Sequence, residues 1–201
     1  MFDTELFGHW WFEGPRFVAA VLDLCARSDR LATLSAGALL ERQPPDERVS
    51  LPEGSWGDGG AHGVWLNQAT AWVWPLIHAA ELRFERLAGA ADVAAPVPGA
   101  DPLIERLLRQ AGRELLLLES SDWPYLITTL AAGDYARDRI TRHAEDFERL
   151  AVLAERRTGG GALSEADETF LATVERRDSL FPDLDWRVYA GRAARERVST
   201  G

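Results

Sequence analysis

The chain has 201 residues, enough for one well-formed hydrophobic core or two small ones. Its formal net charge of -10 argues against a nucleic-acid partner, because such binding draws on a surplus of positive charge. No stretch reaches the roughly 18 apolar residues of a membrane helix, and no signal-peptide pattern is present, so we expect no membrane partner. A single cysteine, Cys25, excludes an internal disulfide and favours a cytoplasmic location.

The N-terminal residues are predicted to form a strand, a loop and two helices. A strand of about five residues should end near Phe7, followed by a helix over residues 15–28. Proline is tolerated at the first helical position, where its missing N–H would have no partner. Ser35 is predicted to cap a short helix that ends near Leu40.

The middle of the chain combines a glycine-rich loop with one helical region. Residues 49–63 contain the loop, and Asn67 is predicted to cap a helix that follows it. Pro75 should kink this helix or begin a second one, which runs to about Leu87. The Ala-, Pro- and Gly-rich residues 89–99 are predicted to form a loop.

The remainder is predicted to be helical up to an extended aromatic tail. A capping residue followed by proline begins a helix over residues 101–119, and residues 120–124 have the same pattern and mark the start of another helix. A long amphipathic helix is expected over 134–157, and a serine–aspartate capping pair begins the last one, at 164–177. Residues 180–189 should be extended. The predicted class is therefore mainly α: a helical bundle preceded by a β-α fragment.

Tryptophan is the unusual feature of the composition. The chain has eight Trp residues but only three Tyr, and all but Trp186 precede the last third. Flat aromatic rings stack on the C–H faces of pyranoses, so the composition is compatible with sugar binding. The same residues also serve as large core side chains, and we expect Trp72 and Trp74, on a helix, to do so.

The segment FDTELFGHWWFEGP, residues 2–15, concentrates polar chemistry beside two adjacent indoles. In strand geometry Asp3 and Glu5 point to the same side. Two carboxylates in one environment repel, which raises one pKa and suits a proton donor. The residues alone are equally compatible with two surface acids.

This segment resembles the fourth sequence motif of family-57 glycoside hydrolases, in the form found in α-glucan branching enzymes. The segments LPEGSWGDGG, VWLN, ELLLLESSDWPYLITT and FPDLDWRVYA resemble the same subgroup in the same order. The resemblance implies an incomplete (β/α)7 barrel followed by a helical C-terminal domain. Residues 1–34 would then be the last strand and helix of the barrel, and residues 35–201 the helical domain.

The resemblance implies a 1,4-α-glucan branching enzyme of glycogen or α-glucan biosynthesis, which cleaves α-1,4 links and forms α-1,6 links by a retaining double displacement. Asp3 would be the general acid/base. A retaining mechanism needs a nucleophilic carboxylate about 5 Å away, which the family carries on an earlier barrel strand. No segment here resembles the nucleophile motif, and Glu5 lies too near Asp3 on the same strand to replace it. We therefore expect the isolated chain to be inactive.

The predicted substrate-binding residues combine cleft tryptophans with polar neighbours: Trp56, Trp65, Asp122, Trp123, Trp10 and His9. By resemblance, Trp56 and Trp65 line the cleft that holds the acceptor glucan and excludes water. The glycines around Trp56 would let its loop bring the indole against the sugar. Asp122 serves equally well as a helix cap, and His9 as a structural hydrogen-bonding residue.

No cofactor or metal is predicted, because the four histidines are scattered and no nucleotide-binding motif is present. The expected partner is an α-glucan, together with the missing barrel part or a second copy that would cover exposed apolar surface. Two alternatives remain open. The first is a non-catalytic glucan-binding or assembly module. The second is a 4-α-glucanotransferase or amylase of the same family, although GSWGDGG and SSDWP favour branching.

Overall fold

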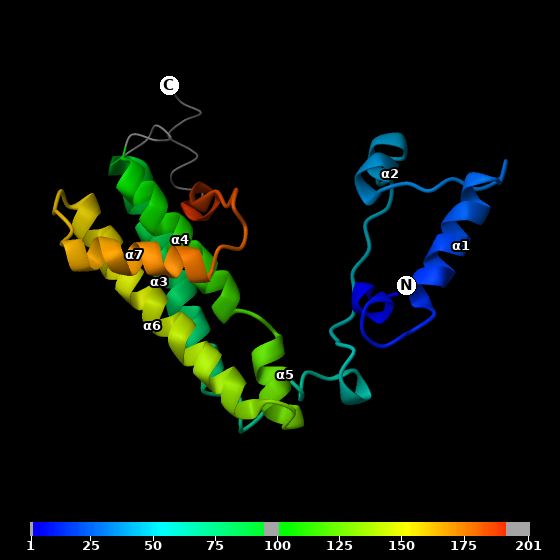
Figure 1. The fold of residues 1–201 in the computed structure, drawn as a ribbon, viewed down its shortest axis with the longest axis horizontal. Coiled ribbons are helices and arrows are strands. Elements are labelled where there is room, and N and C mark those ends of the chain that lie inside the picture. The colour runs from blue at the N-terminus through cyan, green and yellow to red at the C-terminus, as the bar shows by residue number, and fades with distance from the viewer. Residues whose placement is uncertain (1, 95–100, 192–201) are drawn as a thin grey trace. The chain divides into compact units, whose positions relative to one another are not determined.

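The computed structural model describes residues 2–94 and 101–191, and within these ranges the regular elements are α-helices and short 3-10 helices (Figure 1). The chain divides into two compact units, one ending at Glu53 and the other beginning at Gly54. The predicted mainly-α class is thus confirmed. None of the helices in the described ranges is long and apolar enough to cross a membrane.

The first unit contains a 3-10 helix, η1 (Thr4–Phe7), and two α-helices, α1 (Gly14–Ala26) and α2 (Ala36–Arg42). The strand predicted to end near Phe7 is wrong, because η1 occupies its place. A lone strand leaves its main-chain groups without partners, whereas a turn satisfies them locally. Here Leu6 N–H donates to the Asp3 carbonyl at 3.2 Å, and His9 N–H donates to that of Glu5 at 2.8 Å.

Aromatic rings gather in the first unit, but without a buried core. Phe2, Phe7, Trp11 and Phe17 form ring pairs with centroids 4.9 to 6.2 Å apart. Gly14 allows the close approach, since a Cβ there would lie 2.9 Å from the Phe7 ring. The buried apolar side chains of the described residues all fall between positions 73 and 190. The first unit is therefore held by local contacts and ring packing.

In its described residues the second unit is a bundle of five α-helices, α3 (Val73–Ala94), α4 (Pro102–Leu118), α5 (Asp122–Thr129), α6 (Gly133–Thr158) and α7 (Glu165–Arg177), with two 3-10 helices, η2 (Asp58–Gly60) and η3 (Trp186–Tyr189). α4 and α3 pack along α6, and α5 packs on the N-terminal part of α6 (Figure 1). Fully buried side chains from the three long helices meet in the core, among them Phe84, Leu107 and Phe147. This core is the rigid frame for the loops that precede α3.

The helix starts of this unit follow the sequence closely. The Asp101 carboxylate accepts from the N–H groups of Leu103 and Ile104 at 3.0 and 3.2 Å, which confirms the predicted cap. Ser164 and Asp167 form the predicted capping box, with each side chain bonded to the other's main chain.

Three other sequence predictions need correction. Asn67 does not cap an α-helix: its side chain closes a turn by accepting from Ala69 N–H at 2.9 Å, and α3 begins only at Val73. Residues 89–94 of the predicted loop continue α3, because their alanines favour helix, and residues 95–100 lie outside the described ranges. The predicted extended tail instead contains η3, which buries Trp186 almost completely.

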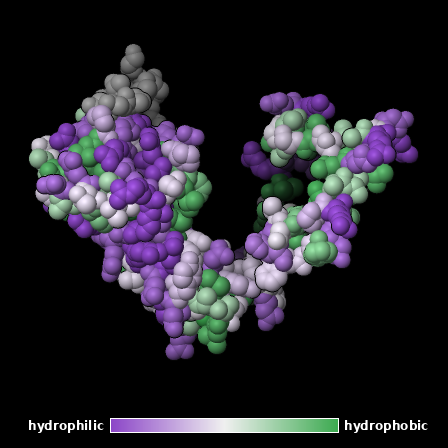
Figure 2. All heavy atoms as spheres, in the orientation of Figure 1, coloured by the Kyte–Doolittle hydropathy of each residue, from purple (hydrophilic) through white to green (hydrophobic). Residues whose placement is uncertain are grey.

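Charged side chains link the helices at the surface. Arg83 of α3 is paired with Glu148 of α6 and, at 3.1 Å, with Glu155 two turns further along. Arg106 of α4 is paired with Glu175 of α7 at 2.6 Å. Hydrophilic side chains predominate on the visible face of α6 and α7 (Figure 2). These pairs join neighbouring helices around the apolar core.

Candidate functional site

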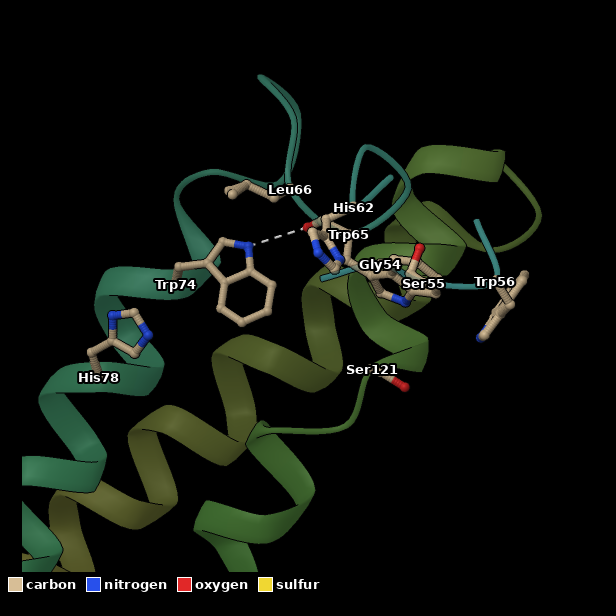
Figure 3. A pocket seen from close by; sticks show the side chains of 9 residues that line it. All are labelled: Gly54, Ser55, Trp56, His62, Trp65, Leu66, Trp74, His78 and Ser121. Atoms are coloured by element: carbon tan, nitrogen blue, oxygen red, sulfur yellow. Dashed lines mark hydrogen bonds between the residues drawn. The ribbon is translucent and has the colours of Figure 1, made fainter. Parts of the chain in front are cut away.

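The loops before α3, the first turns of α3 and the start of α5 border an open pocket of about 610 Å³ within the second unit. Figure 3 shows the side chains that line it, which are mostly aromatic or apolar: Gly54, Ser55, Trp56, His62, Trp65, Leu66, Trp74, His78 and Ser121. An apolar hollow with a few polar groups at its wall is the usual form of a small-molecule or sugar site.

A compact glycine-rich loop carries Trp56 to the edge of this pocket. Ser55 closes the loop: its N–H donates to the Gly60 carbonyl at 2.9 Å and its hydroxyl donates to the Ala61 carbonyl. Gly60 has φ of 73°, a conformation that strains other residues. A Cβ at Gly57 would lie 2.9 Å from the Ala61 oxygen and 3.0 Å from the Trp65 ring. The glycines predicted to bring an indole close to a ligand are thus required by the loop itself.

Trp56 and Trp65 form an aromatic platform with Tyr125 of α5. The two indoles meet edge to face at 4.9 Å between centroids, and the Tyr125 ring lies 5.7 Å from Trp56. Trp65 is half-buried, but Trp56 leaves 76% of its surface exposed. An exposed indole held at a fixed angle is what stacking against a flat apolar ligand face requires.

Trp74 and His78 extend the lining along the first turns of α3. Their rings lie 6.2 Å apart, one helical turn from each other, as Figure 3 shows. Trp74 was expected to be a core residue, and it does pack against the core, but its indole also faces the pocket. Tyr125 and His78 were missed, because a tyrosine and a histidine on helices carry no sequence signal of their own.

Asp122 and Trp123 lie at the start of α5, next to Ser121 of the pocket wall. Asp122 is exposed and accepts from the Ser120 hydroxyl at 3.1 Å, whereas the N-cap position belongs to Ser121. Trp123 is only 9% exposed, and its Nε1–H donates to the Leu117 carbonyl at 2.7 Å. The structure therefore places Asp122 at the surface and Trp123 in the packing of the bundle.

Asp3, His9 and Trp10 belong to the first unit. Asp3 is exposed and occupies the N-cap position of η1 without a side-chain capping bond. His9 and Trp10 line a hollow of about 250 Å³ together with Trp11 and Pro15, and Trp10 is 76% exposed. All three predicted site residues of the FDTELFGHWWFEGP segment are thus open to solvent within their unit.

One buried cluster has the composition of a metal site: Glu114, His143 and Asp178 offer ligand atoms within 4.8 Å of one another. The hydrogen bonds argue for a different role. Arg139 directs two N–H groups at His143 Nε2, at 3.2 and 2.8 Å, so this nitrogen must be the acceptor. The proton then sits on Nδ1, which donates to Glu114 at 2.6 Å and has no lone pair for a metal. The cluster is a structural network between α4 and α6.

This network also contains a carboxyl group, that of Glu114, whose pKa is raised. Burial raises the pKa of the Glu114 carboxyl, and hydrogen bonds from His143 and Gln110 oppose that shift only in part. The neighbouring charge of Asp178 acts in the same direction as burial.

Comparison with known proteins identifies the family. Residues 77–189 match the family model for the C-terminal region of 1,4-α-glucan branching enzymes, and this chain belongs to that family. A 1,4-α-glucan branching enzyme of Thermococcus kodakarensis is 41% identical over 181 residues, which are 90% of this chain but 25% of the relative. The chain thus spans about a quarter of the length of that relative.

Solved structures agree in fold and extend to the first unit. A family-57 branching enzyme of Pyrococcus horikoshii superposes with a TM-score of 0.71 at 41% identity, over 94% of this chain and 34% of that one. An α-amylase, AmyC of Thermotoga maritima, gives a TM-score of 0.62 at 30% identity, over 94% and 32% respectively. The predicted resemblance to the branching-enzyme type of family 57 is confirmed.

Proposed function

We propose that this chain forms the helical side of the glucan-binding cleft of a 1,4-α-glucan branching enzyme. The platform of Trp56, Trp65 and Tyr125 beside an apolar pocket carries the proposal. Pyranose rings present apolar C–H faces to aromatic side chains, while their hydroxyls remain free for water or polar groups. Family membership supports an α-glucan as the ligand, since the relatives are named for that substrate.

In the proposed reaction, Asp3 is the general acid/base of a retaining double displacement. It protonates the glycosidic oxygen as the α-1,4 bond breaks and later removes the proton from the incoming 6-hydroxyl of the acceptor. Its exposed carboxyl is free to serve such a role. His9 and Trp10 contribute substrate contacts from the same segment. The proposal assigns no nucleophile to the residues of this chain.

The tryptophan platform would favour transfer over hydrolysis. A branching enzyme must hold an acceptor glucan and keep water from the intermediate. Stacking on Trp56 and Trp65 would place a sugar in the position that bulk water would otherwise occupy. Asp122, exposed at the start of α5, would contact the sugar beside the pocket, whereas Trp123, buried in the bundle, would support the start of α5. An amylase has less support, because identity falls from 41% with a branching enzyme to 30% with AmyC.

Glucan binding by the chain is tested by affinity electrophoresis in gels that contain amylopectin. Trp56→Ala removes the most exposed ring of the platform and should weaken binding about tenfold or more. Leu82→Ala is the matched control, because Leu82 is 56% exposed on α3 and is not among the lining residues. Equal retardation of the wild type and Trp56→Ala would remove Trp56 from the proposed cleft.

A further inference from the structure

The main chain of Trp65 is fixed by two side-chain donors. Its carbonyl oxygen accepts from the Thr70 hydroxyl at 2.8 Å and from Trp74 Nε1–H at 3.1 Å, the bond drawn in Figure 3. Both lone pairs of this carbonyl are therefore used. Thr70 is fully buried and in turn accepts from Asn67 N–H at 3.0 Å. The segment that carries Trp65 is thus held against the start of α3.

A second set of bonds holds the same segment against α5, more than sixty residues away. The Thr128 hydroxyl donates to the Val64 carbonyl at 2.7 Å and accepts from Asn67 Nδ2 at 2.8 Å. The other Nδ2 proton of Asn67 goes to the Gly63 carbonyl at 2.9 Å. Every donor of the Asn67 amide and the Thr128 hydroxyl is therefore engaged.

α5 also supplies the third ring of the platform. Tyr125 and Thr128 are three residues apart and so lie on one face of this helix. Tyr125 contacts the Trp56 ring, while Thr128 holds the residue before Trp65. Ile127 and Trp123 bury the opposite side of α5 in the bundle. One firmly packed helix thus sets the position of both indoles.

We infer that Thr128 and Asn67 are positioning residues, which fix the angle of Trp65 against Trp56 for stacking on a glucan. This inference rests on the proposed function of the platform. Neither side chain lines the pocket, so their effect on a ligand must pass through Trp65. The hydrogen bonds of the Thr128 hydroxyl with the Val64 carbonyl and the Asn67 amide contribute little to the free energy of folding, but they fix the position of the Trp65 ring.

The test compares Thr128→Val, which keeps the shape but loses the hydroxyl, with Thr128→Ser, which keeps the hydroxyl. Each is made in the wild-type chain and in Trp65→Ala, and the dissociation constant for amylopectin is measured. Thr128→Val should weaken amylopectin binding about fivefold, which corresponds to about 1 kcal/mol. Thr128→Ser should bind amylopectin as tightly as the wild type does. In Trp65→Ala the Thr128→Val change should have no further effect, because its route to the ligand is gone.

A second readout needs no ligand. The edge-to-face pair of Trp56 and Trp65 should give an exciton couplet in circular dichroism. Thr128→Val and Asn67→Asp should both reduce this couplet, while Thr128→Ser should preserve it. Asn67→Asp keeps the acceptor for Ala69 N–H and loses both amide donors.

The outcomes separate the two ideas. A reduced couplet in a chain that binds no glucan would overturn the proposed function, and with it the role of Thr128 in glucan binding, but not its hold on Trp65. An unchanged couplet, or an equal loss of binding from Thr128→Val with and without Trp65, would overturn the positioning role itself.

Discussion

The two units of this chain contain similar local signals but differ in how they use apolar side chains. In the second unit, α3, α4 and α6 bury large residues such as Phe84 and Phe147 completely. In the first unit Phe17 stays 40% exposed although it contacts the rings of Phe2 and Trp11. Helix caps and prolines can begin a helix anywhere in a chain, but a buried core forms only where long amphipathic helices pack against one another.

The comparison between the two units predicts its largest difference for the truncation of one phenylalanine in each unit to alanine. Phe147→Ala should lower the free energy of unfolding by about 3–5 kcal/mol, because it leaves a cavity in a closed core. Phe17→Ala should change the main transition by no more than about 0.5 kcal/mol. Urea unfolding followed by circular dichroism measures both. Similar losses would mean that the two units share one cooperative core.

A second prediction uses the buried acid of the second unit. Because burial raises the folded-state pKa of Glu114, its contribution to stability is complete below the unfolded pKa, about 4.3, and is lost as the pH rises through the folded value. Above that value the folded protein must hold a charged carboxylate away from water, whereas in the unfolded chain the same carboxylate is solvated.

Glu114→Gln should remove that loss. The difference in urea midpoint between wild type and variant, measured at a series of pH values, should therefore change in favour of the variant as the pH rises. Glu85→Gln, at an exposed position of α3, is the control and should give a flat difference. A flat difference for Glu114→Gln as well would contradict the raised pKa.

The smallest effect compares two serine caps of the same geometry. Ser35 and Ser164 each accept from the main-chain N–H three residues later at 3.2 Å. Ser164→Ala should destabilise the second unit by about 1 kcal/mol. Ser35→Ala should leave the unfolding transition of the second unit unchanged and reduce only the helix content of the chain. Thermal unfolding at 222 nm distinguishes them. A comparable shift of the main transition in Ser35→Ala would show that α2 unfolds with the bundle.

Local chemistry decided which parts of the fold could be predicted from the sequence. Asp101 with Pro102, and Ser164 with Asp167, mark helix starts through bonds that span only three residues, and both predictions are confirmed. The strand near Asp3 was wrong because a strand depends on a neighbouring strand, which is a non-local condition. The loop predicted at residues 89–94 was wrong because burial of Ala91 in the bundle supports the continued helix.

The candidate site divides in the same way. Trp56 and Trp65 were predicted from the resemblance of their segments, GSWGDGG and VWLN, to the family, and the structure brings the two rings together. Tyr125 and Thr128 could not be predicted, because their importance arises from contacts across about sixty residues of sequence. The catalytic role of Asp3 and the substrate contacts of the other named residues stay predictions.

The ion pairs of Arg83 also set the alignment of two helices. Its partners, Glu148 and Glu155, lie seven residues apart, so one guanidinium spans two turns of α6. If α6 slid along α3 by four residues, the side chains that replaced them would be Ala144 and Ala151 in one direction, or Val152 and Gly159 in the other. Either slip would leave the arginine without a carboxylate. The spacing of the two acids thus favours a single register of α6 against α3.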